Sequence, residues 1–172
     1  MGTDTESDLQ SFVEGRYLHL RRTAYLLCGD WHRAEDLVQT ALARVVVAAR
    51  RRAIENLDAY ARIVLTRVYL DDRRRLPRWR ERFLGSPEER PAPPDDQALT
   101  LTIIEALRAL PPRQRAAVVL RYWEDRSTEE TAEVLGVTTG TVKSQCAKAL
   151  AALRGPLAEM RPEFSLNRRG GK

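Results

Sequence analysis

Apolar residues recur every three or four positions along most of the chain, and this helical period limits the possible folds more than any other feature of the sequence. The clearest example is residues 34–49, where one side of the expected helix is apolar and the other is polar. No segment of useful length alternates apolar and polar residues as a half-buried strand does. The sequence therefore predicts an all-α protein.

Three helices are predicted in the N-terminal part of the chain. The first ends at Gly29, and Asp30 is placed to cap the second. Asn56 is placed to cap the third, which is expected to stop before Pro77. Short loops join these helices, so we expect them to pack as one small bundle over residues 7–76.

One stretch breaks the helical period and separates two parts of the chain. Residues 77–97 contain five of the nine prolines, mixed charges and few aliphatic side chains, which is typical of a linker. The helical period then returns, which predicts a second helical domain over residues 98–156 and a C-terminal tail over 157–172. The predicted fold is two small helical domains joined by a flexible linker.

A short corner in the second domain indicates what that domain binds. Ser127 and Glu130 have the spacing of a capping box, and the helix that they begin should end at Gly136, which can adopt the left-handed conformation. Ala132 stands four residues before Gly136, and Val142 stands six residues after it, which is the spacing of a helix-turn-helix. Taken alone, the same corner also fits an ordinary helical hairpin with a solvated polar face.

The second helix of this corner would be the recognition helix. Short polar and basic side chains on its outer face can reach base edges and phosphates in a major groove. The inward face is expected to hold Val142, Cys146, Ala149 and Leu153. The outward face is expected to hold Thr141, Lys143, Ser144, Gln145, Ala147 and Lys148.

Segments in both predicted domains resemble one family of bacterial transcription proteins. Residues 110–154, which include LPPRQR, LRYWED and GTVKS, closely resemble the DNA-binding fourth domain of extracytoplasmic-function sigma factors. The stretch RTAYLLCGDWHRAEDLVQTALARV, residues 22–45, resembles the second domain of the same family, and NLDAYARIVLTRVYLDDRRR resembles the helix that follows. The chain is most similar to the compact actinobacterial members. The resemblance implies a dissociable sigma subunit that directs core RNA polymerase to specific promoters.

The resemblance also implies three binding surfaces. The recognition helix would meet the minus-thirty-five promoter element through its outward residues. A cognate anti-sigma protein, which restrains many family members, is a further candidate partner. The large catalytic subunits of core polymerase would be bound through Asp36, Gln39, Thr40 and Arg44. The minus-ten promoter element would be bound through Tyr60, Arg62, Arg67, Tyr69, Arg73, Arg74 and Arg75.

Charge agrees with an anionic partner without identifying it. The net charge is +5, and residues 62–82 hold eight arginines against three acidic residues, interleaved with Tyr69 and Trp79. Such a stretch can follow a phosphate backbone and stack on unpaired bases. A solvated helix face or a surface for an acidic protein would have the same composition. Two other functions therefore stay open: a one-component helix-turn-helix regulator that binds DNA without polymerase, and a protein-interaction module.

Other kinds of function find little support in the sequence. Cys28 and His32 provide too few ligands for a metal site, and Cys146 stands far from both, so we expect no metal and no cofactor. No phosphate loop, nucleophile elbow or pair of catalytic carboxylates is present, so we expect a protein that is not an enzyme. The polar N-terminus and the lack of a long apolar run predict a soluble, cytoplasmic protein.

Overall fold

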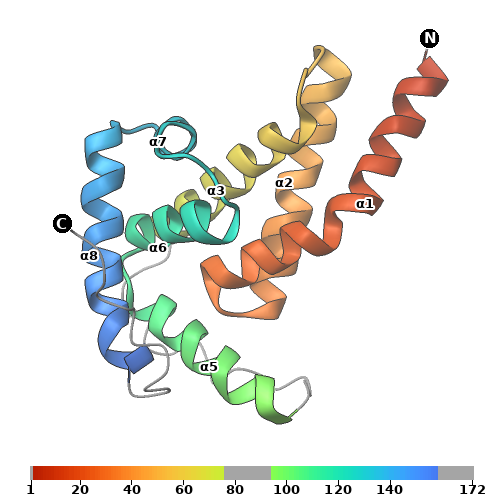
Figure 1. Ribbon diagram of the computed structural model, residues 1–172. Coiled ribbons are helices and arrows are strands. Elements are labelled where there is room, and N and C mark those ends of the chain that lie inside the picture. The colour runs from red at the N-terminus through yellow and green to blue at the C-terminus, as the bar shows by residue number, and fades with distance from the viewer. Residues whose placement is uncertain (1, 76–93, 159–172) are drawn as a thin grey trace.

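The computed structural model describes residues 2–75 and 94–158, and every regular element in these two ranges is a helix (Figure 1). The predicted all-α class is therefore confirmed. Within the same ranges, no helix is both long enough and apolar enough to cross a membrane. Most of the predicted linker, residues 77–93, and most of the predicted tail, residues 159–172, lie outside the described residues.

The N-terminal domain is a bundle of three helices. It consists of α1 (Gly2–Cys28), α2 (Trp31–Arg51) and α3 (Leu57–Arg75). The predicted helix starts are confirmed, because the Asp30 side chain accepts a hydrogen bond from the Arg33 amide at 2.8 Å and the Asn56 side chain accepts one from the Ala59 amide at 2.9 Å. Helix α2 packs against both of its neighbours along its apolar stripe, which is buried from Ala34 onward.

The C-terminal domain is built around its last helix, α8, which packs against α5, α6 and α7. It consists of α5 (Pro94–Ala109), α6 (Pro112–Val118), the π-helix η1 (Val119–Trp123), α7 (Thr128–Leu135) and α8 (Thr139–Ala158). Two boundaries differ from the prediction. Helix α5 begins inside the predicted linker, since a proline suits the first turn of a helix, and α8 runs two residues into the predicted tail. The π-helix was not predicted.

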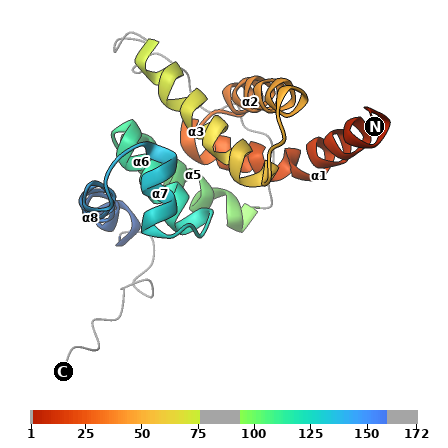
Figure 2. The ribbon, with the colours of Figure 1, turned by 90° about the horizontal axis from the view of Figure 1, so that it is seen from above.

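The two predicted helical domains are confirmed, but they also pack against each other, which the sequence did not predict. Helix α1 contacts α5, α6 and η1, and helix α3 contacts α6 and α7. Figures 1 and 2 both show α6 beside α3. One apolar core runs through this contact and joins Leu27 and Leu65 of the first domain to Leu120 and Leu135 of the second. The described chain is therefore one packed body with a seam between its halves.

Candidate nucleic-acid and polymerase interfaces

The helix-turn-helix corner is fixed by the predicted caps. The Ser127 hydroxyl accepts a hydrogen bond from the Glu130 amide at 3.0 Å, and the Glu130 carboxylate accepts one from the Ser127 amide at 2.7 Å. Gly136 ends α7 in the left-handed conformation, with φ of 63°. The Thr138 hydroxyl then accepts a hydrogen bond from the Thr141 amide at 3.2 Å and so begins α8. The turn that aims α8 is thus set by local hydrogen bonds.

The faces of α8 are those that the sequence predicts. All four residues of the inward face are buried, with Val142 and Ala149 almost fully so. On the outward face, Lys143, Ser144, Ala147 and Lys148 are exposed, and Thr141 and Gln145 are half-buried at the edges. The exposed face therefore combines two lysines with the short side chains of Ser144 and Ala147, which allow close approach to a major groove.

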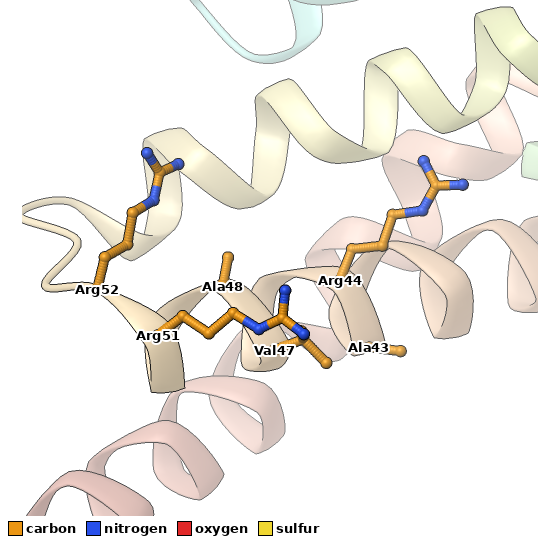
Figure 3. A pocket seen from close by; sticks show the side chains of 6 residues that line it. All are labelled: Ala43, Arg44, Val47, Ala48, Arg51 and Arg52. Atoms are coloured by element: carbon orange, nitrogen blue, oxygen red, sulfur yellow. The ribbon is translucent and has the colours of Figure 1, made fainter.

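The residues expected to bind core polymerase form one stripe on α2. Asp36, Gln39, Thr40 and Arg44 are all exposed, and positions 36, 40 and 44 follow one another on successive turns. A shallow groove continues this stripe toward the end of the helix (Figure 3). Its lining consists of Ala43, Arg44, Val47, Ala48, Arg51 and Arg52. The side chain of Val47 is 47% exposed there, so the surface combines an apolar floor with basic side chains.

The residues expected to bind the minus-ten element do not form one open surface. Arg67, Arg74 and Arg75 are exposed, and Tyr60 is half-buried with the Arg52 guanidinium 5.3 Å above its ring. Arg73 is half-buried as well. The two remaining residues of the set, Arg62 and Tyr69, are buried and lie on the side of α3 that faces the second domain.

The surroundings of Arg62 and Tyr69 differ from those of their exposed neighbours. Arg62 donates from Nε to Glu124 at 3.0 Å and from Nη2 to Asp58 at 3.1 Å. Tyr69 is 0% exposed, and its hydroxyl has no hydrogen-bond partner in the described part of the chain. Burial raises the pKa of Tyr69, an effect that the nearby Arg115 opposes. In this arrangement neither side chain is open to a ligand.

Glu124 stands at the centre of the seam between the domains. Its carboxylate accepts hydrogen bonds from the Thr23 hydroxyl at 2.5 Å and from Arg62 at 3.0 Å, and it lies 2.9 Å from Nε2 of His19. Trp123 adds a bond from its indole nitrogen to the Thr23 hydroxyl oxygen at 3.0 Å. Burial raises the pKa of the Glu124 carboxyl, but the hydrogen bonds outweigh it, so the pKa lies below its ordinary value.

A second buried charge, Arg115, ties together the ends of two helices. Its guanidinium donates to the carbonyl oxygen of Leu27 near the end of α1 at 2.6 Å. It also donates to the carbonyl oxygens of Arg108 and Leu110 at the end of α5, at 2.6 and 3.1 Å. A cation is favourable at the C-terminus of a helix, where the last carbonyl groups lack partners. Burial nevertheless lowers the pKa of Arg115.

Sequence reasoning assigned no role to Glu124 or Arg115, although Glu124 lies in the LRYWED motif and Arg115 in the LPPRQR motif, which carry the family resemblance. Glu124 is a charged residue between two exposed neighbours, Trp123 and Asp125, so the sequence pattern around it does not indicate burial. The π-helix η1 ends directly before Glu124, and the wider turn of such a helix changes the direction of the side chains that follow. Only the folded chain brings Glu124 to its partners.

Metal ligands are not gathered anywhere in the described ranges. Cys28 is buried, which raises the pKa of its thiol to about 11, and Cys146 is buried in the second domain. Among the described residues, no group of three or more His, Cys, Asp or Glu side chains is placed to hold an ion.

The second domain is a helix-turn-helix with a basic recognition face, and the first domain exposes arginines on α3. This combination defines a DNA-binding transcription protein. Comparison with known proteins agrees with this class in both halves. Residues 12–80 match the family model of sigma-70 region 2, and residues 100–153 match that of sigma-70 region 4.

Two RNA polymerase sigma factors are similar to most of the chain. The RNA polymerase sigma-E factor of Streptomyces coelicolor is 40% identical over 160 residues, which cover 87% of this chain and 86% of that protein. The extracytoplasmic-function RNA polymerase sigma factor SigL of Mycobacterium tuberculosis (strain H37Rv) is 34% identical over 154 residues, or 82% of this chain and 84% of that one.

A solved structure is also similar over both domains. It is the sigma factor RpoE of Bartonella quintana in complex with the anti-sigma factor NepR, with a TM-score of 0.71 and 26% identity over 90% of this chain and 99% of that chain. The chain described here belongs to the sigma-70 family and is an RNA polymerase sigma factor of the extracytoplasmic-function type. Proteins of this kind bind core RNA polymerase and direct it to promoters.

Proposed function

We propose that three helices of this sigma factor each bind a different partner. In this proposal α2 binds the large catalytic subunits of core polymerase, α3 binds the minus-ten element and α8 binds the minus-thirty-five element. The observation that carries the proposal is the exposed recognition face of α8, held by a complete capping box and a left-handed glycine in the part of the chain that matches region 4. A helix so fixed presents the same side chains to every promoter.

The DNA contact expected of each α8 residue depends on the chemistry of its side chain. Lys148 and Lys143 are exposed cations, and a lysine can donate to guanine O6 or N7 or bind a phosphate. Ser144 and Ala147 are small enough to let the helix approach the groove closely. The half-buried Thr141 and Gln145 lie at the edge of the face, where contact with phosphate is expected.

On the first domain, α2 and α3 take different partners. The α2 stripe of Asp36, Gln39, Thr40 and Arg44 is polar and exposed on successive turns, as a surface for another protein would be. The α3 arginines cluster in its last turn, where Arg74 and Arg75 can bind phosphates. Arg62 and Tyr69 belong to the same proposed minus-ten surface but must first be uncovered.

Three further expectations concern catalysis, location in the cell and an additional protein partner. We assign no catalytic residue to this chain, since the chemistry of transcription belongs to the polymerase. We expect the protein to work where the polymerase works, in the cytoplasm. An anti-sigma protein is a further candidate partner, because the similar RpoE structure is a complex with the anti-sigma factor NepR.

Binding to core polymerase is the first test. The double variant Asp36→Arg/Gln39→Ala changes two exposed residues of the α2 stripe, and Asp8→Arg/Gln10→Ala makes the same changes at exposed positions on α1. We expect only the first to weaken capture of purified core polymerase, by tenfold or more, with circular dichroism unchanged in both. Equal capture by the two variants would show that the α2 assignment is wrong.

Run-off transcription from a promoter library is the second test. The wild-type chain should initiate transcription only together with core polymerase. Tight, sequence-specific binding to DNA by the chain alone, without any gain from core polymerase, would instead favour the one-component regulator.

A further inference from the structure

We propose that Lys143 and Lys148 are acylation sites through which binding of the minus-thirty-five element is switched off, while the arginine surface on α3 is left unchanged. The modifying reagent is an activated acyl group, carried as an acyl phosphate or an acyl thioester. The inference rests on the proposed function for the assignment of α8 and α3 to the two promoter elements. The acylation sites themselves rest on the distribution and the surroundings of the lysines.

Lysine is rare in this chain, and its positions are restricted. Only three of the 29 lysine and arginine residues are lysines, namely Lys143, Lys148 and Lys172. The first two are the only lysines in the ranges that the structure describes, and both lie on the exposed outward face of α8. The basic residues of α3 are all arginines. The two proposed DNA surfaces therefore differ in the chemistry of their cations.

Lysine and arginine respond differently to an acyl donor. A lysine Nζ that has released its proton to water attacks the carbonyl carbon of the donor, and an N–C bond forms. The bond from that carbon to the phosphate oxygen or the thiol sulfur breaks, and the phosphate or thiol leaves with the electron pair. An arginine guanidinium keeps its proton and does not react in this way. An acyl donor would therefore modify the proposed minus-thirty-five surface and leave the α3 arginines unchanged.

Both lysine side chains are open to such a donor. Each is exposed, and neither has a hydrogen bond or an ion pair with any other described residue. The exposed residue one turn away is small in each case, Ala147 for Lys143 and Ser144 for Lys148. Several arginines, by contrast, are held by carboxylates: Arg16, Arg21, Arg33, Arg50, Arg62 and Arg126. Modification of the two lysines would therefore break no contact within the described part of the chain.

Acylation removes what these lysines offer to DNA. A lysine ammonium carries a positive charge and three N–H donors, which bind a phosphate or donate to guanine O6 or N7. The acylated side chain is a neutral amide with a single N–H donor. The rest of the outward face is uncharged, since it consists of Thr141, Ser144, Gln145 and Ala147. Acylation of both lysines would therefore leave this face without positive charge, while the α3 arginines keep theirs.

Treatment of the full chain with an acyl donor tests the sites. The purified chain is incubated with acetyl phosphate in one arm and with acetyl coenzyme A in the other, and peptide mass spectrometry measures acetylation at each lysine. We expect acetylation at Lys143 and Lys148 in at least one arm, and the arm in which it occurs identifies the donor. Absence of acetylation at both positions in both arms would refute the proposal.

A homogeneous modified chain tests the effect on DNA binding. N-acetyl-lysine is incorporated at Lys143 and Lys148 by amber suppression, and the chain is assembled with core polymerase. Its affinity for a promoter from the library selection should fall by about tenfold or more, and the salt dependence of binding should decrease by about two released ions. Its affinity for a minus-ten single strand should stay within about twofold of the unmodified holoenzyme. N-acetyl-lysine at Lys172 is the control and should change neither affinity. Unchanged promoter affinity in the doubly modified chain would refute the switch.

A variant without the two amines shows whether the donor acts through them. Lys143→Arg/Lys148→Arg keeps both charges, and each chain is compared with its own untreated sample, so any change in basal DNA binding cancels. Acetyl phosphate should reduce run-off transcription by wild type and by Lys172→Arg in proportion to the acetylated fraction, and should change that of the double variant by less than about twofold. An equal loss in the double variant would show that acylation acts elsewhere and would overturn the proposal.

Protection in the promoter complex separates this proposal from the proposed function. Acetylation of Lys143 and Lys148 should be slower in the complex of holoenzyme with promoter than in the free chain, because DNA covers the amines. Equal rates in the two samples would count against the assignment of α8 to the minus-thirty-five element alone. Failure of the untreated chain to form a transcribing holoenzyme would likewise count against the proposed function, since acetylation of the free chain does not depend on polymerase.

Discussion

Replacement of Arg115 by leucine should destabilise the whole fold, because one buried side chain supports three main-chain carbonyl groups. The carbonyl oxygens of Leu27, Arg108 and Leu110 would lose their partner. A stranded buried acceptor costs about 1–3 kcal/mol. Removing a buried cation whose Nε has no hydrogen-bond partner among the described residues returns part of that cost. We therefore expect a net loss of about 3 kcal/mol in the free energy of unfolding.

Urea denaturation followed by circular dichroism measures this loss. The midpoint should fall at constant slope, and the melting temperature should drop by roughly 6–12 °C for a chain of this size. Arg113→Leu is the matched control, since Arg113 is an exposed arginine on the same helix and should change stability by less than about 0.5 kcal/mol. If the two variants unfold within about 0.5 kcal/mol of each other, the three carbonyl bonds do not stabilise the fold as inferred.

Three further predictions concern single positions. Gly29→Ala should lower the free energy of unfolding in urea by about 1–2 kcal/mol, because Gly29 has φ of 74° and an added Cβ would lie 2.6 Å from Cγ of Arg108. Gly15→Ala inside α1 is the control: its added Cβ would have no atom within 4 Å, so this change should be neutral or stabilising. The Glu124 carboxyl has a pKa below its ordinary value of 4.5, so its ionised form stabilises the folded chain above that pH and this contribution is lost as the pH falls further. Urea unfolding should show this loss in the wild-type chain but not in Glu124→Gln. Lys148→Ala should relax one base-pair preference in the upstream motif of promoters selected by the holoenzyme, by about 1–3 kcal/mol, and an unchanged motif would remove Lys148 from base readout.

The local features of this fold could be predicted from sequence because their causes are local. Asp30, Ser127 and Gly136 act on residues one turn away, so their spacing alone indicates where helices begin and end. The buried and exposed faces of α8 follow in the same way from a period that the sequence displays. These predictions needed no knowledge of how the domains meet.

The divided environment of α3 could not be predicted, since it depends on contacts between distant parts of the chain. Arg62 and Arg67 are both arginines on one helix, yet the first is buried and the second is exposed. The difference arises from Glu124, which is 62 residues from Arg62 along the chain and is brought to it only by the packing of the second domain. Sequence composition therefore identified the basic helix but not which of its arginines are available.

The same difference in burial predicts how salt acts on DNA binding. Arg74 and Arg75 are exposed, and exposed charges act over roughly 8–10 Å at moderate ionic strength without needing a fixed geometry. The Arg62 guanidinium is instead held by the Glu124 carboxylate, and the Tyr69 ring is buried. In this arrangement the exposed arginines can attract a phosphate backbone, while the Tyr69 ring cannot stack on an unpaired base. We therefore expect salt to weaken DNA binding by the free chain, and we expect that binding to discriminate little among minus-ten sequences.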